Sequence, residues 1–179
     1  GACAVRARPS THPPPPPSLD FNYYRFHGAA EPPEERAVSI CTVDTYDILR
    51  KKLPKAKVAD GDIGENILIR GPPSLATKAG ALKVGMLLGL GDTAVVEIKH
   101  INKPCYRLLN VPWSQEAQAK YDYEHKDPGG MVLKQWFRHP SLPLNVDTHP
   151  GGRGYLAKVV TEGHVRDGDA VTVLTRPPS

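Results

Sequence analysis

Hydrophobic and polar residues alternate in short runs along this chain, which is the pattern of β-strands buried on one face. The clearest run covers residues 94–101, where Val96, Ile98 and His100 share one face and the residues between them share the other. Residues 86–90 form a second run, and Gly91-Asp92 lies between the two. This order predicts a β-hairpin whose second arm is half-buried, with His100 facing the core.

Other segments complete a pattern of short elements. We predict a helix over about residues 45–52, with Asp44 as N-cap and Pro54 ending it. A second helix is predicted over residues 114–126 and a loop over 140–150. Further strands are predicted over residues 36–43, 66–70, 154–160 and 170–174.

The fold class follows from these elements and from composition. Many short strands with few helices favour a mainly β protein, a small closed or partly closed barrel. The 19 prolines and 16 glycines favour turns and argue against a helical bundle. With 40% hydrophobic and 23% charged residues, the 179-residue chain has the composition of one globular domain.

The first residues differ from the rest. Pro13 to Pro17 are an unbroken proline run, which predicts extended polyproline II structure. We therefore expect a disordered or extended Pro-rich arm over residues 1–19, followed by one domain over 20–179. The composition of the arm fits either a merely disordered segment, which we favour, or the remnant of an organelle transit peptide. We therefore expect a cytoplasmic protein, with the organelle matrix as the alternative if the arm is such a remnant. We expect no membrane association, because no apolar run is long enough to cross a bilayer.

Net charge suggests the kind of ligand. The formal charge is +4 and the basic residues are scattered. This distribution argues against stable nucleic-acid binding and suits a small anionic ligand, such as a phosphate ester.

The three cysteines lack paired spacing, which argues against a disulfide framework, a structural zinc site or a four-cysteine iron–sulfur cluster. Cys3 lies in the arm, and Cys41 lies within a predicted strand and should be in the core. Cys105 follows Pro104 and is flanked by Lys103 and Arg107, whose charges favour the thiolate. Taken alone, these residues still favour a structural role for Cys105 over a reactive one.

Several motifs shift the interpretation of Cys105 from a structural role toward a functional one. Asp62-Ile63-Gly64-Glu65-Asn66-Ile67, then Leu82-Lys83-Val84-Gly85, the hairpin and Lys103-Pro104-Cys105 occur in the order found in the MOSC domain. That family is named for the C-terminal domain of molybdenum cofactor sulfurase. Residues 152–169 resemble the family's closing segment, and residues 20–28 and 36–38 resemble the start of stand-alone bacterial members. The resemblance covers most of residues 20–174.

The resemblance implies a β-barrel-like fold that binds the molybdenum cofactor (Mo-molybdopterin), with Cys105 coordinating the metal or carrying sulfur. Known relatives reduce N-hydroxylated bases or amidoximes. A similar activity here would need a small N-hydroxylated substrate and an external electron-donor protein, since the sequence has no evident flavin, haem or iron–sulfur motif. The alternatives are a cofactor or sulfur carrier without turnover, and a non-catalytic barrel that binds a protein partner. Complete sulfurase activity would need a pyridoxal-phosphate domain, which we do not expect in a chain of this length.

Four basic residues are candidates for binding the cofactor. Its phosphate calls for cationic or N–H donors, and the candidates are Arg25, Arg36, Lys103 and Arg153. Arg153 lies between glycines, where the backbone can approach a ligand closely. Each of the four could equally be a solvated surface charge.

The remaining candidates are polar residues near these motifs. Glu65 and Asn66 could bond the pterin or orient the cysteine loop, or merely tie a turn to its neighbours. His27 is a candidate proton donor on the substrate side, or a structural residue. Two departures from the family, Ala29-Ala30 after His27-Gly28 and an apparent insertion over residues 131–150, concern the substrate pocket.

Overall fold

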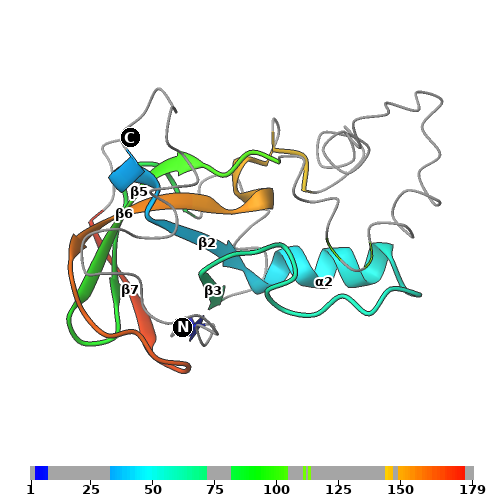
Figure 1. Ribbon diagram of the computed structural model, residues 1–179, viewed down its shortest axis with the longest axis horizontal. Helices are drawn as coiled ribbons and strands as arrows, with labels where there is room; N and C mark the ends of the chain where they lie inside the picture. Colours follow the sequence, from blue (N-terminus) through cyan, green and yellow to red (C-terminus); the bar gives the residue numbers. More distant parts are fainter. Residues whose placement is uncertain are drawn as a thin grey trace.

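The strands of the computed structural model form one closed barrel (Figure 1) in the order β1-β3-β2-β6-β5-β4-β7. The structure describes residues 3–7, 33–71, 82–104, 111, 113, 144–146 and 149–175. Neighbouring strands are antiparallel except for β2 and β3, which are parallel. The predicted mainly β, barrel-like fold is confirmed. The elements are β1 (Cys3–Ala7), η1 (Pro33–Arg36), β2 (Val38–Thr42), α2 (Val43–Lys52), β3 (Ile67–Arg70), β4 (Leu87–Leu90), β5 (Ala94–Ile101), η3 (Pro150–Arg153), β6 (Tyr155–Thr161) and β7 (Ala170–Thr175).

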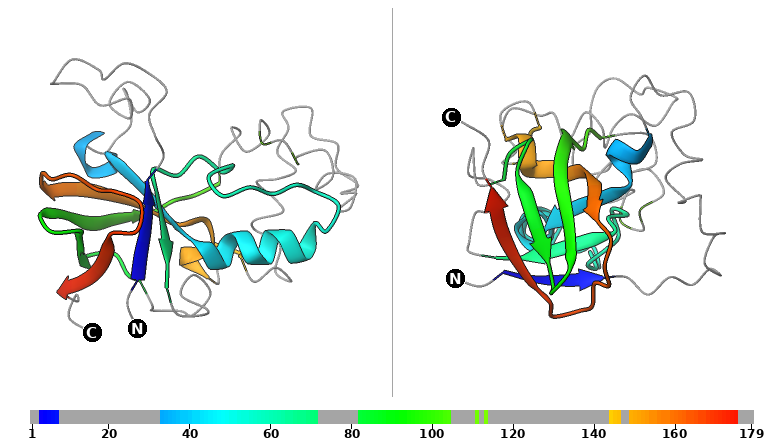
Figure 2. Two further views of the ribbon diagram at one scale, coloured as in Figure 1. Left: turned by 90° about the horizontal axis from the view of Figure 1, so that it is seen from below. Right: turned by 90° about the vertical axis from the view of Figure 1, so that its left-hand side faces the viewer.

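Strand β1 closes the barrel by pairing with β3 on one side and β7 on the other. Figure 2 shows it crossing the lower side of the ring of strands. The sequence predicts an arm here, but Cys3–Ala7 belong to the barrel. The proline run lies outside the described residues.

Two buried clusters lie on opposite faces of β2. Ile40 faces the barrel interior with Leu88 and Ile98, whereas Cys41 faces α2 and packs with Leu49. This split follows from the two-residue period of a strand, as the alternation over residues 36–43 predicts. Strand β2 therefore joins the barrel to the helical side of the molecule, where α2 projects from the barrel end (Figure 2).

The predicted hairpin is confirmed, with β4 and β5 joined through a turn in which Gly91 has φ 61°. Val96 and Ile98 are buried, as their shared face predicts. His100 is not a core residue: its side chain is 24% exposed and its Nε2 lies 3.1 Å from Glu35 Oε2. The core prediction for His100 fails because the pairing of β5 with β6 shifts register between Ile98 and His100, which breaks the alternation of faces, and this end of β5 contacts η1.

The predicted helix is present as α2, but it begins at Val43 directly after β2. Thr42 is the N-cap and makes no side-chain cap bond, so Asp44 lies in the first turn rather than at the cap. The helix ends before Pro54, as predicted. Thr45 Oγ1 donates a hydrogen bond of 3.2 Å to the Gly152 carbonyl, which ties the first turn of α2 to η3.

The chain between β5 and β6 is described only in part. Pro150, which the sequence places at the end of a loop, begins η3. The predicted helix over residues 114–126 and most of the apparent insertion over 131–150 lie outside the described residues. In the ranges that are described, no helix has both the length and the apolar character to cross a membrane.

Candidate functional site

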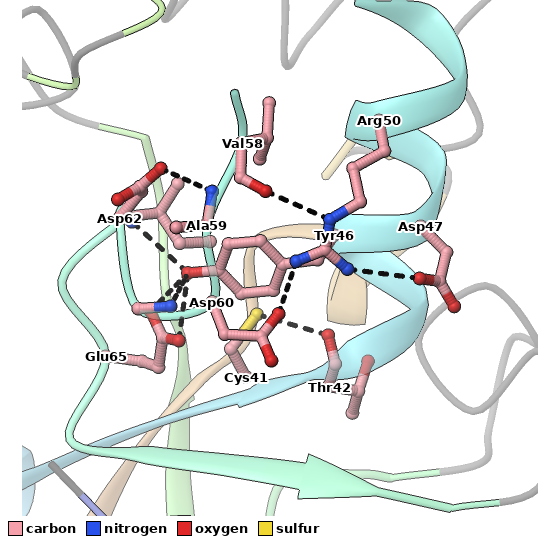
Figure 3. Close-up of polar contacts among 12 residues, drawn as sticks. Cys41, Thr42, Tyr46, Asp47, Arg50, Val58, Ala59, Asp60, Asp62 and Glu65 are labelled. Carbon is pink, nitrogen blue, oxygen red and sulfur yellow. Dashed lines mark hydrogen bonds and ion pairs between the residues drawn. The ribbon is translucent and has the colours of Figure 1, made fainter. Parts of the chain in front are cut away.

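The hydroxyl of Tyr46 is the centre of a buried polar cluster between α2 and the loop before β3 (Figure 3). It accepts N–H bonds from Gly61 at 2.9 Å and Ile63 at 3.2 Å. It lies 2.9 and 2.7 Å from the two carboxylate oxygens of Glu65 and donates its proton to that group. One donor and two acceptor positions are all that a phenol oxygen offers, so its hydrogen-bonding capacity is fully used.

Arg50 holds the outer side of the same loop. Its Nε donates to the Val58 carbonyl at 3.0 Å and its Nη2 to Asp60 Oδ1 at 2.5 Å. Its Nη1 reaches Asp47 Oδ1 at 3.3 Å, and its guanidinium carbon lies 5.5 Å from the centre of the Tyr46 ring. The loop is therefore hydrogen-bonded to α2 twice, by Tyr46 on its inner side and by Arg50 on its outer side.

Glu65 and Asn66, both singled out from the sequence, contact protein groups. Glu65 is 4% exposed and faces Tyr46. Asn66 Oδ1 accepts hydrogen bonds from the backbone N–H of Ser39 at 2.9 Å and its hydroxyl at 2.8 Å. Asn66 thus joins β2 to the start of β3, which is the tying role the sequence left open. A direct contact of either residue with a pterin remains a prediction.

Arg153 ends η3 and is only 5% exposed, so it is not a solvated surface charge. Its Nη2 donates to the Ile63 carbonyl at 2.9 Å. Its Nε and Nη1 are buried and bond no protein group in the structure as described. Leaving such donors unsatisfied is costly, because buried cationic N–H groups lose their water without a replacement. Among the described residues these nitrogens therefore have hydrogen-bonding capacity left for an acceptor.

The glycines beside Arg153 have a different role from the predicted one. An added Cβ at Gly154, where φ is 87°, would overlap the Ile40 carbonyl oxygen. An added Cβ at Gly152 would overlap the backbone of Leu144. The close approach is therefore between segments of this chain, and it brings η3 against β2.

Cys41 lies in the same region and is fully buried. Burial, and then the negative charge of Glu65, raise the pKa of its thiol to about 12, while the positive charge of Arg153 acts in the opposite direction. The thiol therefore stays protonated at neutral pH and is a poor metal ligand. Its predicted core position is confirmed.

The segment that leads to Cys105 leaves the barrel beside η3. Ile101 pairs with Tyr155, and the Asn102 N–H donates to the Gly154 carbonyl at 2.9 Å. Lys103 is exposed and Pro104 is buried. The structure thus brings the residues just before Cys105 to the strand end where Arg153 lies.

Of the remaining candidates, the structure describes only Arg36, which is not brought to this point. Arg36 precedes β2, and the register Val38↔Ala157 and Ile40↔Tyr155 places it farther along β6, away from Arg153. Cys105, His27 and Arg25 lie outside the described residues.

Sequence reasoning missed Tyr46 and Ile63. Tyr46 has the helical spacing of an apolar core residue, although a buried tyrosine needs a partner for its hydroxyl and could have indicated a polar cluster. Ile63 acts through its main-chain groups, which leave no signal in the sequence.

Comparisons with known proteins agree with this fold. The model of the MOSC domain matches residues 23–172. The structure is similar to that of YiiM from Escherichia coli, with TM-score 0.53 and 16% identity over 82% of this chain and 58% of that one. It is also similar to YiiM from Geobacillus stearothermophilus, with TM-score 0.53 and 17% identity over 80% of this chain and 56% of that one.

A crystal structure described only as that of a hypothetical protein gives TM-score 0.54 and 17% identity over 83% of this chain and 57% of that one. The chain therefore spans less than three fifths of the length of these structures, and identities this low show a shared fold. The comparison with curated proteins gives no match. The chain belongs to the MOSC domain family, which is associated with binding of the molybdenum cofactor.

Proposed function

We propose that this protein binds the molybdenum cofactor where β5 and η3 meet, and that it reduces N-hydroxylated compounds such as N-hydroxylated bases or amidoximes. The observation that carries the proposal is Arg153. This side chain is 5% exposed, one nitrogen is held by the Ile63 carbonyl, and Nε and Nη1 have no partner among the described residues. A bound anion or ring acceptor would satisfy them.

The donor set fits the cofactor's chemistry. The cofactor carries a phosphate, and its pterin ring has several acceptor atoms. Arginine suits both, because its planar guanidinium offers several N–H donors in fixed directions. Lys103, exposed two residues before Cys105, would add positive charge near the point where β5 and η3 meet. Cys105 is proposed as the thiolate ligand of the metal, as the family resemblance implies.

The bound cofactor would supply the two electrons that remove oxygen from an N–OH group. The chain would supply binding, orientation and protons. Arg153 would fix the cofactor's orientation, and Cys41 would not compete for the metal because its thiol remains protonated. We propose His27 as the proton donor to the leaving oxygen, since an imidazole titrates near neutral pH. Electrons would come from an external donor protein.

Metal analysis tests the binding part of this proposal. We expect molybdenum and pterin to copurify with the wild-type chain from a host that makes the cofactor, and to be lost in Cys105→Ala without loss of fold. Cys41→Ala is the matched control, because it removes a buried thiol from the core and should keep the metal while lowering the melting temperature. Equal metal content in wild type and Cys105→Ala would contradict Cys105 as the ligand.

Turnover tests the reductase part. The loaded protein, supplied with a reduced viologen, should convert an N-hydroxylated purine or an amidoxime to the parent base or amidine. Fully loaded protein that reduces neither would favour a carrier of the cofactor or of sulfur. A chain that binds no cofactor at all would leave a non-catalytic interaction domain.

A further inference from the structure

The part of the loop that bonds Arg153 is itself bonded by the phenol oxygen of Tyr46. Tyr46 accepts the N–H groups of Gly61 and Ile63 and donates to Glu65 (Figure 3). The carbonyl of Ile63 in turn accepts the hydrogen bond from Arg153 Nη2 at 2.9 Å. A continuous series of contacts therefore runs from the Tyr46 hydroxyl through Ile63 to the Arg153 guanidinium.

We propose that Tyr46 is a positioning residue for cofactor binding, which acts by fixing Ile63 so that its carbonyl holds Arg153 with Nε and Nη1 directed to the ligand. This inference rests on the proposed function. Tyr46 touches neither the cofactor nor the substrate in this scheme, and its effect passes entirely through Arg153.

The loop needs such a fastening because its backbone is permissive. Gly61 and Gly64 have φ values of 87° and 83°, in the left-handed region that glycine enters without strain. Two such residues on either side of Ile63 allow many loop conformations. The Tyr46 hydroxyl selects one of them, since it bonds Gly61, Ile63 and Glu65 together.

Ile63 is well suited to transmit this restraint. Its side chain is 5% exposed and packs in the core cluster with Leu49, Leu53 and Trp113. Its N–H is held by Tyr46 and its carbonyl by Arg153. The N–H and the carbonyl belong to the two peptide groups joined at the Ile63 Cα, so a shift of the N–H group that displaces this Cα also displaces the carbonyl.

The charges of the cluster explain why Arg153 remains buried before a ligand arrives. Glu65 and Arg153 both act electrostatically on Cys41, so the two opposite charges share one buried region. Glu65 therefore offsets part of the cost of burying the guanidinium.

A double-mutant cycle in cofactor affinity tests the proposal. The probe is isolated molybdenum cofactor, bound anaerobically to apo-protein, and the variants are Tyr46→Phe, Arg153→Met and both together. Tyr46→Phe should weaken binding about tenfold in the wild-type background, because loss of the hydroxyl misplaces the charge-assisted donors of Arg153. In the Arg153→Met background the same change should alter affinity by less than about twofold.

Tyr155→Phe is the matched control. Its hydroxyl is also buried and donates to the Leu82 carbonyl at 2.7 Å, inside the barrel and away from the loop. Both Tyr155→Phe and Tyr46→Phe should lower stability, but Tyr155→Phe should change affinity by less than about twofold.

The outcomes separate this inference from the proposed function. Equal weakening by Tyr46→Phe in both backgrounds would mean a merely structural role and would overturn the inference alone. The inference alone would also be overturned if Tyr46→Phe bound the cofactor with wild-type affinity while Arg153→Met bound it poorly. Failure of the wild type to bind, or unchanged binding by Arg153→Met, would overturn the proposed site and the inference with it.

Hydrogen exchange provides the same test without a Tyr46 variant, should Tyr46→Phe not fold. Coupling is reciprocal, so the cofactor should slow exchange of the Gly61 and Ile63 amides in the wild type. It should not do so in Arg153→Met. Exchange that is unaffected in the wild type, or slowed equally in both proteins, would contradict the coupling.

Discussion

Replacement of Gly154 by alanine tests the junction that places Arg153. Gly154 has φ 87° and ψ −163°, a combination that only glycine adopts readily. Its N–H donates to the Gly151 carbonyl and its own carbonyl accepts from Asn102, both at 2.9 Å. An added methyl group would overlap the Ile40 carbonyl oxygen of β2. The residue therefore cannot keep its conformation or its position when a side chain is added.

The cost has two parts. A non-glycine residue in this backbone region costs about 1–3 kcal/mol. Overlap with a packed neighbour adds about 1–3 kcal/mol. We therefore expect Gly154→Ala to lower the free energy of unfolding by about 4 kcal/mol, which for a chain of this size lowers the melting temperature by about 8–16 °C.

Gly168 provides the control, since it has φ 90° and nothing within 4 Å of an added Cβ. Gly168→Ala carries the backbone cost alone, about 2 kcal/mol. Urea denaturation followed by circular dichroism measures both variants under one condition. Equal losses in the two proteins would refute the close contact between η3 and β2.

The remaining predictions concern buried groups. Cys41, with its pKa raised to about 12, should react with iodoacetamide at pH 8 only after unfolding, and peptide mass spectrometry that finds it labelled in the folded protein would contradict this. The pKa of Tyr155 is likewise raised by burial to about 12, so the protonated forms of both groups are favoured by folding. The stability that these two groups contribute should thus be complete below about pH 9 and be lost as pH rises toward 12, and unfolding free energies that stay level between about pH 9 and 12 would disprove it. Asn66→Ala should cost about 1–3 kcal/mol in urea denaturation, because both the N–H and the hydroxyl of Ser39 lose their acceptor, and no loss would show that water replaces it.

The barrel could be predicted from sequence where burial follows a local pattern. Val96 and Ile98 repeat every second residue, and Gly91 permits the turn before them, so the hairpin needed no long-range information. Strand β1 could not be predicted in this way. Cys3–Ala7 form a strand because β3 and β7, far away in the sequence, offer unpaired edges on both sides. Tertiary pairing of this kind overrides local composition.

The candidate site was predicted in part. Arg153 could be found because a cation between glycines points to a close approach, although the approach is to β2 and Leu144 rather than to a ligand. Its burial depends on the packing of η3 and could not be read from the sequence. Tyr46 had the spacing of a core residue of α2, and the main-chain carbonyl of Ile63 has no side-chain identity to detect.

The affinity of Arg153→Met for isolated molybdenum cofactor is the most direct test of the site. Methionine keeps most of the side-chain volume and removes every donor. Loss of charge-assisted hydrogen bonds worth about 1.5–3 kcal/mol predicts binding at least about tenfold weaker than that of the wild type, with the fold retained. Wild-type affinity in this variant would show that the buried guanidinium does not hold the cofactor.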